Sequence, residues 1–221
     1  MAETGREMKF AGILSTYATI EEMYLFKKLM ERPQGGPIGV LSLTRGEQQK
    51  FPSGFTIEAD KTPNRAFAAK LFGEEAIASG VQRVVQELQA GTVRGLLVMN
   101  GIPDFALPAD LVEAAKKAAV PRGERPPPGP ARRGGPRRLP GTAWAEKDGT
   151  FMNFEGRVQR IRKAVEPPVH ARPEAQWLQE ALVALGARPA VTSIEGVFRE
   201  AMPGYDYGKI GNLGVKTNGT A

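Results

Sequence analysis

The sequence predicts an α/β fold, a parallel, doubly wound sheet built from βαβ units. Two continuous apolar runs, Ile38–Leu43 and Val93–Asn100, have the composition of strands that are covered on both faces. Segments with helical spacing alternate with these runs, and the connections between them are short. Strands that alternate with helices in this way are typical of a parallel sheet with helices on its faces.

The first elements follow in order from the N-terminal side. The apolar run Phe10–Ser15 predicts a strand or a buried turn. A helix is expected directly after it, because Thr19 and Glu22 stand at the spacing of a capping box. The strand Ile38–Leu43 comes next, and a long irregular stretch follows over Thr44–Asn64.

A second helix and the clearest strand come next. Ser79 is expected to cap the helix and Gly91 to end it; the apolar residues with helical spacing are Val81, Val84, Val85 and Leu88. Val93–Asn100 predicts the clearest buried strand in the chain. A loop and a helix within Pro108–Val120 complete this unit.

The chain beyond Leu139 predicts a loop, extended structure and two further helices. Gly186 is expected to end the first of these helices, whose apolar side would hold Trp177, Leu178, Ala181, Leu182 and Leu185. Ser193–Met202 predicts a short last helix. The tail after Gly204 is rich in glycine, asparagine and lysine, so we expect it to be loosely ordered.

The segment Pro121–Arg138 stands where the next buried strand is expected. It holds six prolines, six arginines and four glycines. Proline donates no hydrogen bond to a sheet, and charged residues are not found in a doubly covered strand. The segment contributes +5 of the formal charge of +6. The rest of the chain therefore gives no electrostatic reason to expect a nucleic acid partner.

A reading-frame change would explain this segment. The codon groups CCN, CGN, GGN and GCN, which encode Pro, Arg, Gly and Ala, have only G or C in their first two positions. Read one nucleotide later, the codons at the start of the segment permit Val-Val-Ser-Asp, and those at its end permit Ala-Ala-Ala-Asp-Leu-Val-Val. Two compensating frame changes that bracket Pro121–Arg138 are therefore our hypothesis. If the printed residues are correct, we expect a solvated polyproline-like loop outside the sheet.

Composition excludes several kinds of site. The chain has no cysteine, so it holds no disulfide, no thiolate nucleophile and no cysteine ligand for zinc or an iron–sulfur cluster. Its start lacks the apolar region of a signal peptide, and no apolar run approaches the roughly 20 residues that span a bilayer. We expect a soluble, cytoplasmic protein whose membrane contact is only through partners.

Four stretches resemble one known family. Leu139–Pro168 (LPGTAWAEKDGTFMNFEGRVQRIRKAVEPP) resembles the signature of the molybdopterin oxidoreductase superfamily, in particular the large iron–sulfur subunit of respiratory NADH:quinone oxidoreductase. Ala18–Met30, Phe55–Ala66 and Val93–Asp104 are similar to the same family. The resemblance implies a parallel-sheet domain of the molybdopterin oxidoreductase type that is incomplete and begins in mid-domain.

The resemblance also implies a division of the chain. Residues 1–120 would be an α/β portion of that domain, 121–138 the aberrant segment, 139–190 a continuation of the domain, and 191–221 a short helix with a loose tail. The implied partners are other subunits of a respiratory NADH:quinone oxidoreductase. The chain would lie in the cytoplasm, peripheral to the inner membrane through that complex.

The candidate ligand site is the set Asn153, Glu155, Gly156 and Arg157. A permissive glycine beside a guanidinium could grip a phosphorylated or pterin-like ligand through amide donors and a charged fork. The alternative is structural, with Glu155 and Arg157 tying a loop to the sheet. Asp60–Arg65 likewise allows two interpretations, a cofactor-facing loop at the carboxyl end of a strand or an ordinary Pro-Asn turn.

Three functions of different classes are open at this point. The leading hypothesis is a scaffold fragment of the large peripheral-arm subunit of NADH:quinone oxidoreductase, non-catalytic alone and without a cofactor of its own. The alternative is a portion of a formate dehydrogenase-like or nitrate reductase-like enzyme that helps to bind molybdopterin guanine dinucleotide. The third is a binding module, in which the Pro-rich and Arg/Gly-rich parts of 121–138 bind a polyproline receptor or RNA.

Overall fold

A three-stranded parallel sheet forms the centre of the protein. The computed structural model describes residues 9–32, 35–43, 46–59, 61–102, 105–118, 138–187 and 191–217. The strands β1 (Phe10–Ser15), β2 (Ile38–Leu41) and β5 (Gly95–Met99) lie in the order β2-β1-β5, and both pairings are parallel. The predicted α/β class with a parallel sheet is confirmed. The frame hypothesis and the predicted polyproline-like loop concern residues that lie, but for Arg138, outside these ranges.

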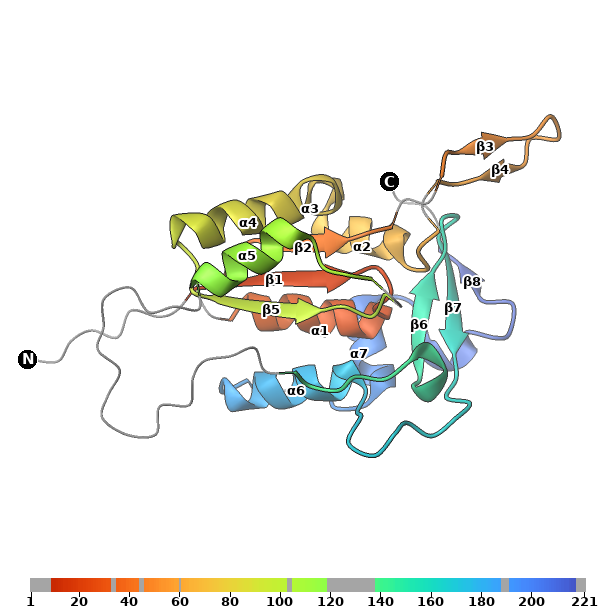
Figure 1. Cartoon of the computed structure of the whole chain (residues 1–221). Helices are drawn as coiled ribbons and strands as arrows, with labels where there is room; N and C mark the ends of the chain where they lie inside the picture. The colour runs from red at the N-terminus through yellow and green to blue at the C-terminus, as the bar shows by residue number, and fades with distance from the viewer. Residues whose placement is uncertain are drawn as a thin grey trace, which may run out of the picture.

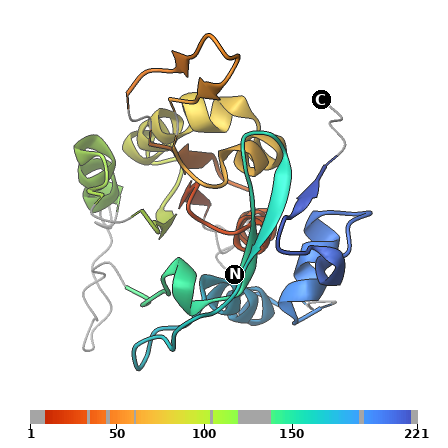
Figure 2. The same ribbon diagram turned by 90° about the vertical axis from the view of Figure 1, so that its right-hand side faces the viewer.

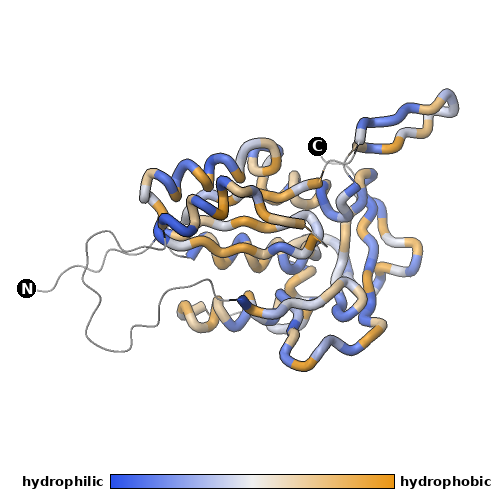
Figure 3. Tube along the Cα trace, viewed as in Figure 1, coloured by the Kyte–Doolittle hydropathy of each residue, from blue (hydrophilic) through white to orange (hydrophobic). Residues whose placement is uncertain are grey.

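Helices cover both faces of this sheet (Figure 1). One face packs against α1 (Ile20–Met30), and the other packs against α4 (Gly80–Ala90) and α5 (Ala109–Ala118). Side chains alternate along a strand, so Ile13 of β1 joins the cluster under α4 and α5, whereas Leu14 joins the cluster around α1. Figure 3 shows the hydrophobic residues along the central strands.

The first helix begins as the sequence predicts. The Thr19 hydroxyl accepts a hydrogen bond from the Glu22 N–H (3.2 Å), and the Thr19 N–H donates to Glu22 Oε2 (2.9 Å). This reciprocal capping box satisfies donors that an α-helix leaves unpaired at its start. Both residues are buried, so the helix start is also a fixed point inside the protein.

A second, antiparallel sheet lies beyond the carboxyl ends of the parallel strands (Figures 1 and 2). It has the order β6-β7-β8, formed by β6 (Gly149–Met152), β7 (Arg157–Ile161) and β8 (Val215–Lys216). The predicted extended structure after Leu139 is the hairpin of β6 and β7. Strands β6 and β7 belong to the stretch Leu139–Pro168, called the signature stretch below. The second sheet places this stretch against the end of the parallel sheet at which α/β proteins bind ligands.

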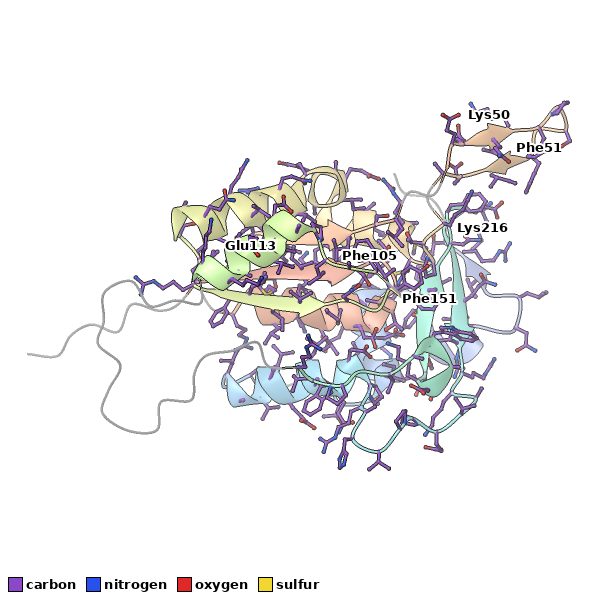
Figure 4. The ribbon with its side chains drawn as sticks, viewed as in Figure 1. Lys50, Phe51, Phe105, Glu113, Phe151 and Lys216 are labelled. Carbon is purple, nitrogen blue, oxygen red and sulfur yellow. The ribbon has the colours of Figure 1, made fainter. Side chains whose placement is uncertain are left out.

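The remaining elements surround these two sheets. Helices α6 (Glu174–Ala184) and α7 (Ile194–Ala201) join the core cluster around α1. A hairpin of two short strands projects from the body, where Figure 4 labels Lys50 and Phe51. The other described elements are β3 (Gln49–Lys50), β4 (Thr56–Ile57), α2 (Arg65–Phe72), α3 (Glu74–Ala78) and the 3₁₀ turns η1 (Trp144–Glu146) and η2 (Tyr207–Lys209).

Three sequence expectations are wrong. Strand β5 is only partly buried along its whole length, because it is an edge of the described sheet. Ser79 does not cap α4; its hydroxyl donates instead to the Glu75 carbonyl of the helix directly before (3.2 Å). The tail after Gly204 is not loose as far as residue 217, because Tyr207 and Ile210 are core residues and β8 pairs with β7.

Candidate functional site

The predicted ligand residues meet in the tight turn between β6 and β7. Asn153 Oδ1 accepts hydrogen bonds from the N–H groups of Glu155 (3.0 Å) and Arg157 (2.8 Å), and the Asn153 carbonyl accepts from the Gly156 N–H (3.0 Å). Gly156 has a φ of 74°, a left-handed conformation that favours glycine. The three turn amides that could grip a phosphate are therefore bonded to Asn153.

The same turn holds the last strand of the chain. The Arg157 guanidinium donates to the Leu213 carbonyl (3.2 Å), and the Gly156 carbonyl accepts from both the N–H and the hydroxyl of Thr217 (2.9 and 2.8 Å). A molybdopterin ligand would have to replace these bonds, so the described geometry does not fit that group well. Binding of a pterin by Asn153, Glu155, Gly156 and Arg157 stays a prediction.

A buried ion-pair cluster joins the signature stretch to the first helix. Lys147 Nζ lies 2.7 Å from Glu22 Oε1 and 2.9 Å from Glu174 Oε2, and the Lys147 side chain is 6% exposed. Burial opposes the charge of Lys147, but the two carboxylates outweigh it and raise the pKa of Lys147 above its usual value. Lys147 is therefore a charged residue inside the protein, paired with one carboxylate of α1 and one of α6.

A second buried carboxylate lies beside this cluster. Glu21 accepts hydrogen bonds from the Thr150 N–H (3.0 Å) and the Thr150 hydroxyl (2.9 Å). Glu21 is fully buried, and this burial raises the pKa of Glu21 from 4.5 to about 7 despite the two hydrogen bonds. Two adjacent glutamates of α1 thus contact the stretch Leu139–Pro168 in different ways. Glu22 forms an ion pair with Lys147, and Glu21 accepts two hydrogen bonds from Thr150.

The resembling stretch Phe55–Ala66 also contacts the start of α1 and strand β6, through Asn64. Asn64 Nδ2 donates to the Ala18 carbonyl (2.8 Å), and Asn64 Oδ1 accepts from the Met152 N–H (2.8 Å). Asn64 is fully buried and precedes α2. Asp60–Arg65 had two interpretations, a cofactor-facing loop and an ordinary turn. The contacts of Asn64 are structural, because its side chain links the loop after β1 to strand β6. Asp60 itself lies outside the described residues.

These contacts define a motif junction, formed by Glu21, Glu22, Asn64, Lys147, Thr150 and Glu174. The backbone of Gly149 lies close to Thr19 at this junction, because a Cβ on Gly149 would lie 2.6 Å from Thr19 Cγ2. None of the six residues belongs to the predicted set Asn153, Glu155, Gly156 and Arg157, although Asn64 lies in the predicted stretch Asp60–Arg65, and Lys147 and Thr150 lie in Leu139–Pro168. One signal was available in the sequence: two adjacent glutamates begin a helix whose other residues are largely apolar, and charged residues in such a position need a partner.

Replacing Asn64 by alanine should lower the free energy of unfolding by about 2 kcal/mol. The substitution leaves the Ala18 carbonyl and the Met152 N–H buried without partners. Urea titration followed by circular dichroism measures the change. The matched control is Asn212→Ala, because Asn212 accepts only one exposed hydrogen bond, from Arg162. A loss as small as that of the control would contradict the role of Asn64.

The described residues give little support for a metal site. No group of three or more His, Asp or Glu side chains among them is arranged to hold a metal ion. In the described part of the chain, no helix has the length and hydrophobicity that a bilayer crossing requires. A groove of about 400 Å³ does lie along β5, and Asn100, Thr142, Glu174 and Trp177 are among the residues that line it.

Comparisons with known proteins find one family model and several relatives that match a part of this chain. Residues 138–181 match the family model of molybdopterin oxidoreductases. The alpha subunit of F420-dependent formate dehydrogenase 2 of Methanococcus maripaludis is 65% identical over 40 residues, 18% of this chain and 6% of that protein. The mitochondrial 78 kDa subunit of NADH-ubiquinone oxidoreductase of Candida albicans is 59% identical over 34 residues, 15% of this chain and 5% of that protein.

A third relative comes from another branch of these enzymes. A nitrate reductase of Symbiobacterium thermophilum is 46% identical over 48 residues, 22% of this chain and 6% of that protein. Each match thus covers a small part of a much longer protein. The matched residues include Lys147 and Thr150 of the motif junction, as well as Asn153 and Arg157 of the turn. The comparisons therefore support the molybdopterin oxidoreductase superfamily for this chain, and they do not single out one member of it.

Proposed function

We propose that the chain is a scaffold portion of the large peripheral-arm subunit of an NADH:quinone oxidoreductase. The observation that carries this proposal is the motif junction. Three stretches that resemble the superfamily bind one another through buried hydrogen bonds and ion pairs. Residues used in this way hold the parallel sheet against the second sheet, which is the work of a scaffold.

The chemistry of the chain supports the same proposal. The chain has no cysteine, so clusters that carry electrons would have to be held by other chains or segments. The turn of β6 and β7 uses its amides and the Arg157 guanidinium for bonds within the chain. The proposed partners are the other subunits of the complex, and contact with the membrane would run through them.

A formate dehydrogenase-like enzyme is the second candidate. It is favoured by the match of three formate dehydrogenase alpha subunits, which are 64–70% identical over 33–40 residues. In this candidate the chain would be part of a site for molybdopterin guanine dinucleotide, with Asn153, Glu155, Gly156 and Arg157 at the ligand. That dinucleotide would supply the redox-active metal centre, and the residues of this chain would bind its phosphates.

Isolation of the assembled complex separates the two candidates. The chain carries an affinity tag and is purified with its partners under mild conditions. NADH oxidation, formate oxidation, molybdenum and pterin are then measured per tagged chain. NADH oxidation without stoichiometric molybdenum supports the scaffold proposal. Formate oxidation with stoichiometric molybdenum and pterin would overturn it in favour of the second candidate.

The Arg157→Ala variant sharpens this experiment. Under the scaffold proposal it should leave the subunit composition and the cofactor content unchanged, because the Arg157 guanidinium makes one exposed hydrogen bond, to the Leu213 carbonyl. Under the second candidate the molybdenum and pterin content should fall. Arg162→Ala is the matched control, since Arg162 makes a similar exposed bond to Asn212.

A further inference from the structure

The β3–β4 arm, residues 46–59, is a hairpin with one apolar face. Its register pairs Lys50 with Thr56, and the Phe51 N–H donates to the Phe55 carbonyl (2.9 Å). Because side chains alternate between the two faces of paired strands, Phe51, Phe55 and Ile57 share one face. Lys50 and Thr56 lie on the other face. The rings of Phe51 and Phe55 contact each other, with their centroids 5.8 Å apart.

The described body of the protein does not cover this apolar face. Phe51 is 43% exposed and Phe55 is 60% exposed. Neither of them, nor Ile57, belongs to a core cluster of the described residues. The arm projects away from both larger sheets in two views at right angles (Figures 1 and 2). A hairpin of two strands is only marginally stable alone in water, so an apolar face on such an arm indicates a contact surface.

A tight turn holds the two aromatic rings in place. The Gly54 N–H donates to the Phe51 carbonyl (2.9 Å), which closes a turn with Pro52 at its second position. Gly54 has a φ of 83°, the left-handed conformation that commonly ends a three-residue hairpin loop. Rings that are fixed before binding lower the entropic cost of association. Aromatic side chains are also enriched at protein interfaces.

Charge and size limit what can cover the arm. Residues 46–59 hold two glutamates and one lysine, a net charge of −1, which disfavours an anionic bilayer or a nucleic acid. Residues 46–55 are all exposed, ten in number, whereas a stable interface takes about 20–30 residues on each side. Two arms that paired only with each other would therefore bury too little surface for a stable dimer. The arm fits one part of a larger contact with a different protein chain.

We propose that the β3–β4 arm binds a different subunit of the complex to which this chain belongs, and that this subunit presents an apolar pocket for the rings of Phe51 and Phe55. The inference rests on the proposed function only for the identity of that complex. Ile57 extends the apolar contact toward the base of the arm. The opposite face, where Gln48 donates to Glu58 (2.9 Å), faces water.

Photo-cross-linking in the assembled complex tests this proposal. In the tagged chain, p-benzoylphenylalanine replaces Phe55, and in a control chain it replaces Lys50. Each complex is purified and irradiated, and the linked peptides are identified by mass spectrometry. Position 55 should link to one defined segment of another subunit, whereas position 50 should not, since it lies on the opposite face. Cross-links from position 55 only to another copy of this chain, to lipid or to this chain itself, or no cross-link at all, would overturn the proposal.

Paired substitutions measure what the two rings contribute. Phe51→Ser with Phe55→Ser should reduce the amount of the cross-linked subunit that the tagged chain retains at least about tenfold, as truncation of central aromatic contacts does. Lys50→Ser with Thr56→Ser changes the opposite face of the same arm, and retention should change less than about twofold. Both variants should unfold at the temperature of the parent, because none of the four residues belongs to a core cluster.

Retention by the aromatic variant equal to that of the parent would contradict the proposed role of the arm. The cross-link identifies the neighbour of the arm, and the NADH and formate oxidation assays identify the complex. Failure of the arm assignment and failure of the proposed function are therefore separate results.

Discussion

Replacing Lys147 by methionine should lower the free energy of unfolding by about 3–5 kcal/mol. Methionine has nearly the volume of lysine, so the packing is retained, while the charge and the two hydrogen bonds of the ammonium group are lost. The buried Glu22 and the partly exposed Glu174 are then left without the positive charge that both contact. Removal of one partner from a buried ion pair costs more than the pair contributes, because the other charge stays desolvated.

Urea denaturation at neutral pH measures this loss. Lys163→Met is the matched control, since Lys163 pairs with Glu166 at the surface and such exposed pairs contribute little. Adding Glu22→Gln to Lys147→Met should recover part of the lost free energy. A loss below about 1 kcal/mol in Lys147→Met would contradict the role of the ion pairs.

The protein should become less stable as the pH rises from about 4.5 to about 7, by up to about 3 kcal/mol through Glu21 alone. Burial raises the pKa of Glu21 from 4.5 to about 7. The folded state therefore holds the Glu21 proton over a pH range in which the unfolded chain has released it. The stabilisation is complete below pH 4.5 and is lost as the pH passes through 7.

The Glu21→Gln variant isolates this effect. Glutamine keeps an acceptor for the Thr150 N–H and a donor for the Thr150 oxygen, but it carries no charge. We expect the variant to be more stable than the parent by about 3 kcal/mol at pH 8 and equally stable at pH 4.5. Thermal unfolding over this pH range measures the difference. The exposed Glu155→Gln is the control, and a pH-independent difference between Glu21→Gln and the parent would refute the assignment.

Local pattern was enough to predict most of the elements. The Thr19–Glu22 capping box was readable because both partners lie within one helical turn. The strand Phe10–Ser15 and the glycine that ends α4 depend on similarly local signals. Gly91 has a φ of 73°, the left-handed conformation expected of such a stop.

The motif junction could not be predicted in the same way. Lys147 and Glu22 are 125 residues apart, and Asn64 and Met152 are 88 apart, so no local spacing connects them. The sequence did show that Leu139–Pro168 resembles a known family. Its polar residues were compatible with both a ligand-binding and a structural interpretation. Only the fold shows which partners those polar atoms have.

The predictions that β5 is fully buried and that the tail is loosely ordered were wrong for a related reason. The run Val93–Asn100 is apolar enough for a strand with neighbours on both sides, but burial depends on a neighbour that another segment has to supply. The glycine-rich tail reads as loose, yet Arg157 and Gly156 bind it from a distant turn. Composition describes a segment and does not describe what packs against it.

The most direct test of the motif junction is a double-mutant cycle between Glu22→Gln and Lys147→Met. The free energy of unfolding is measured for the parent, both single variants and the double variant at pH 7.5. A structural junction predicts a coupling free energy of about 2 kcal/mol between the two side chains, which lie 2.7 Å apart in the interior. Additive effects, with a coupling free energy near zero, would contradict the account.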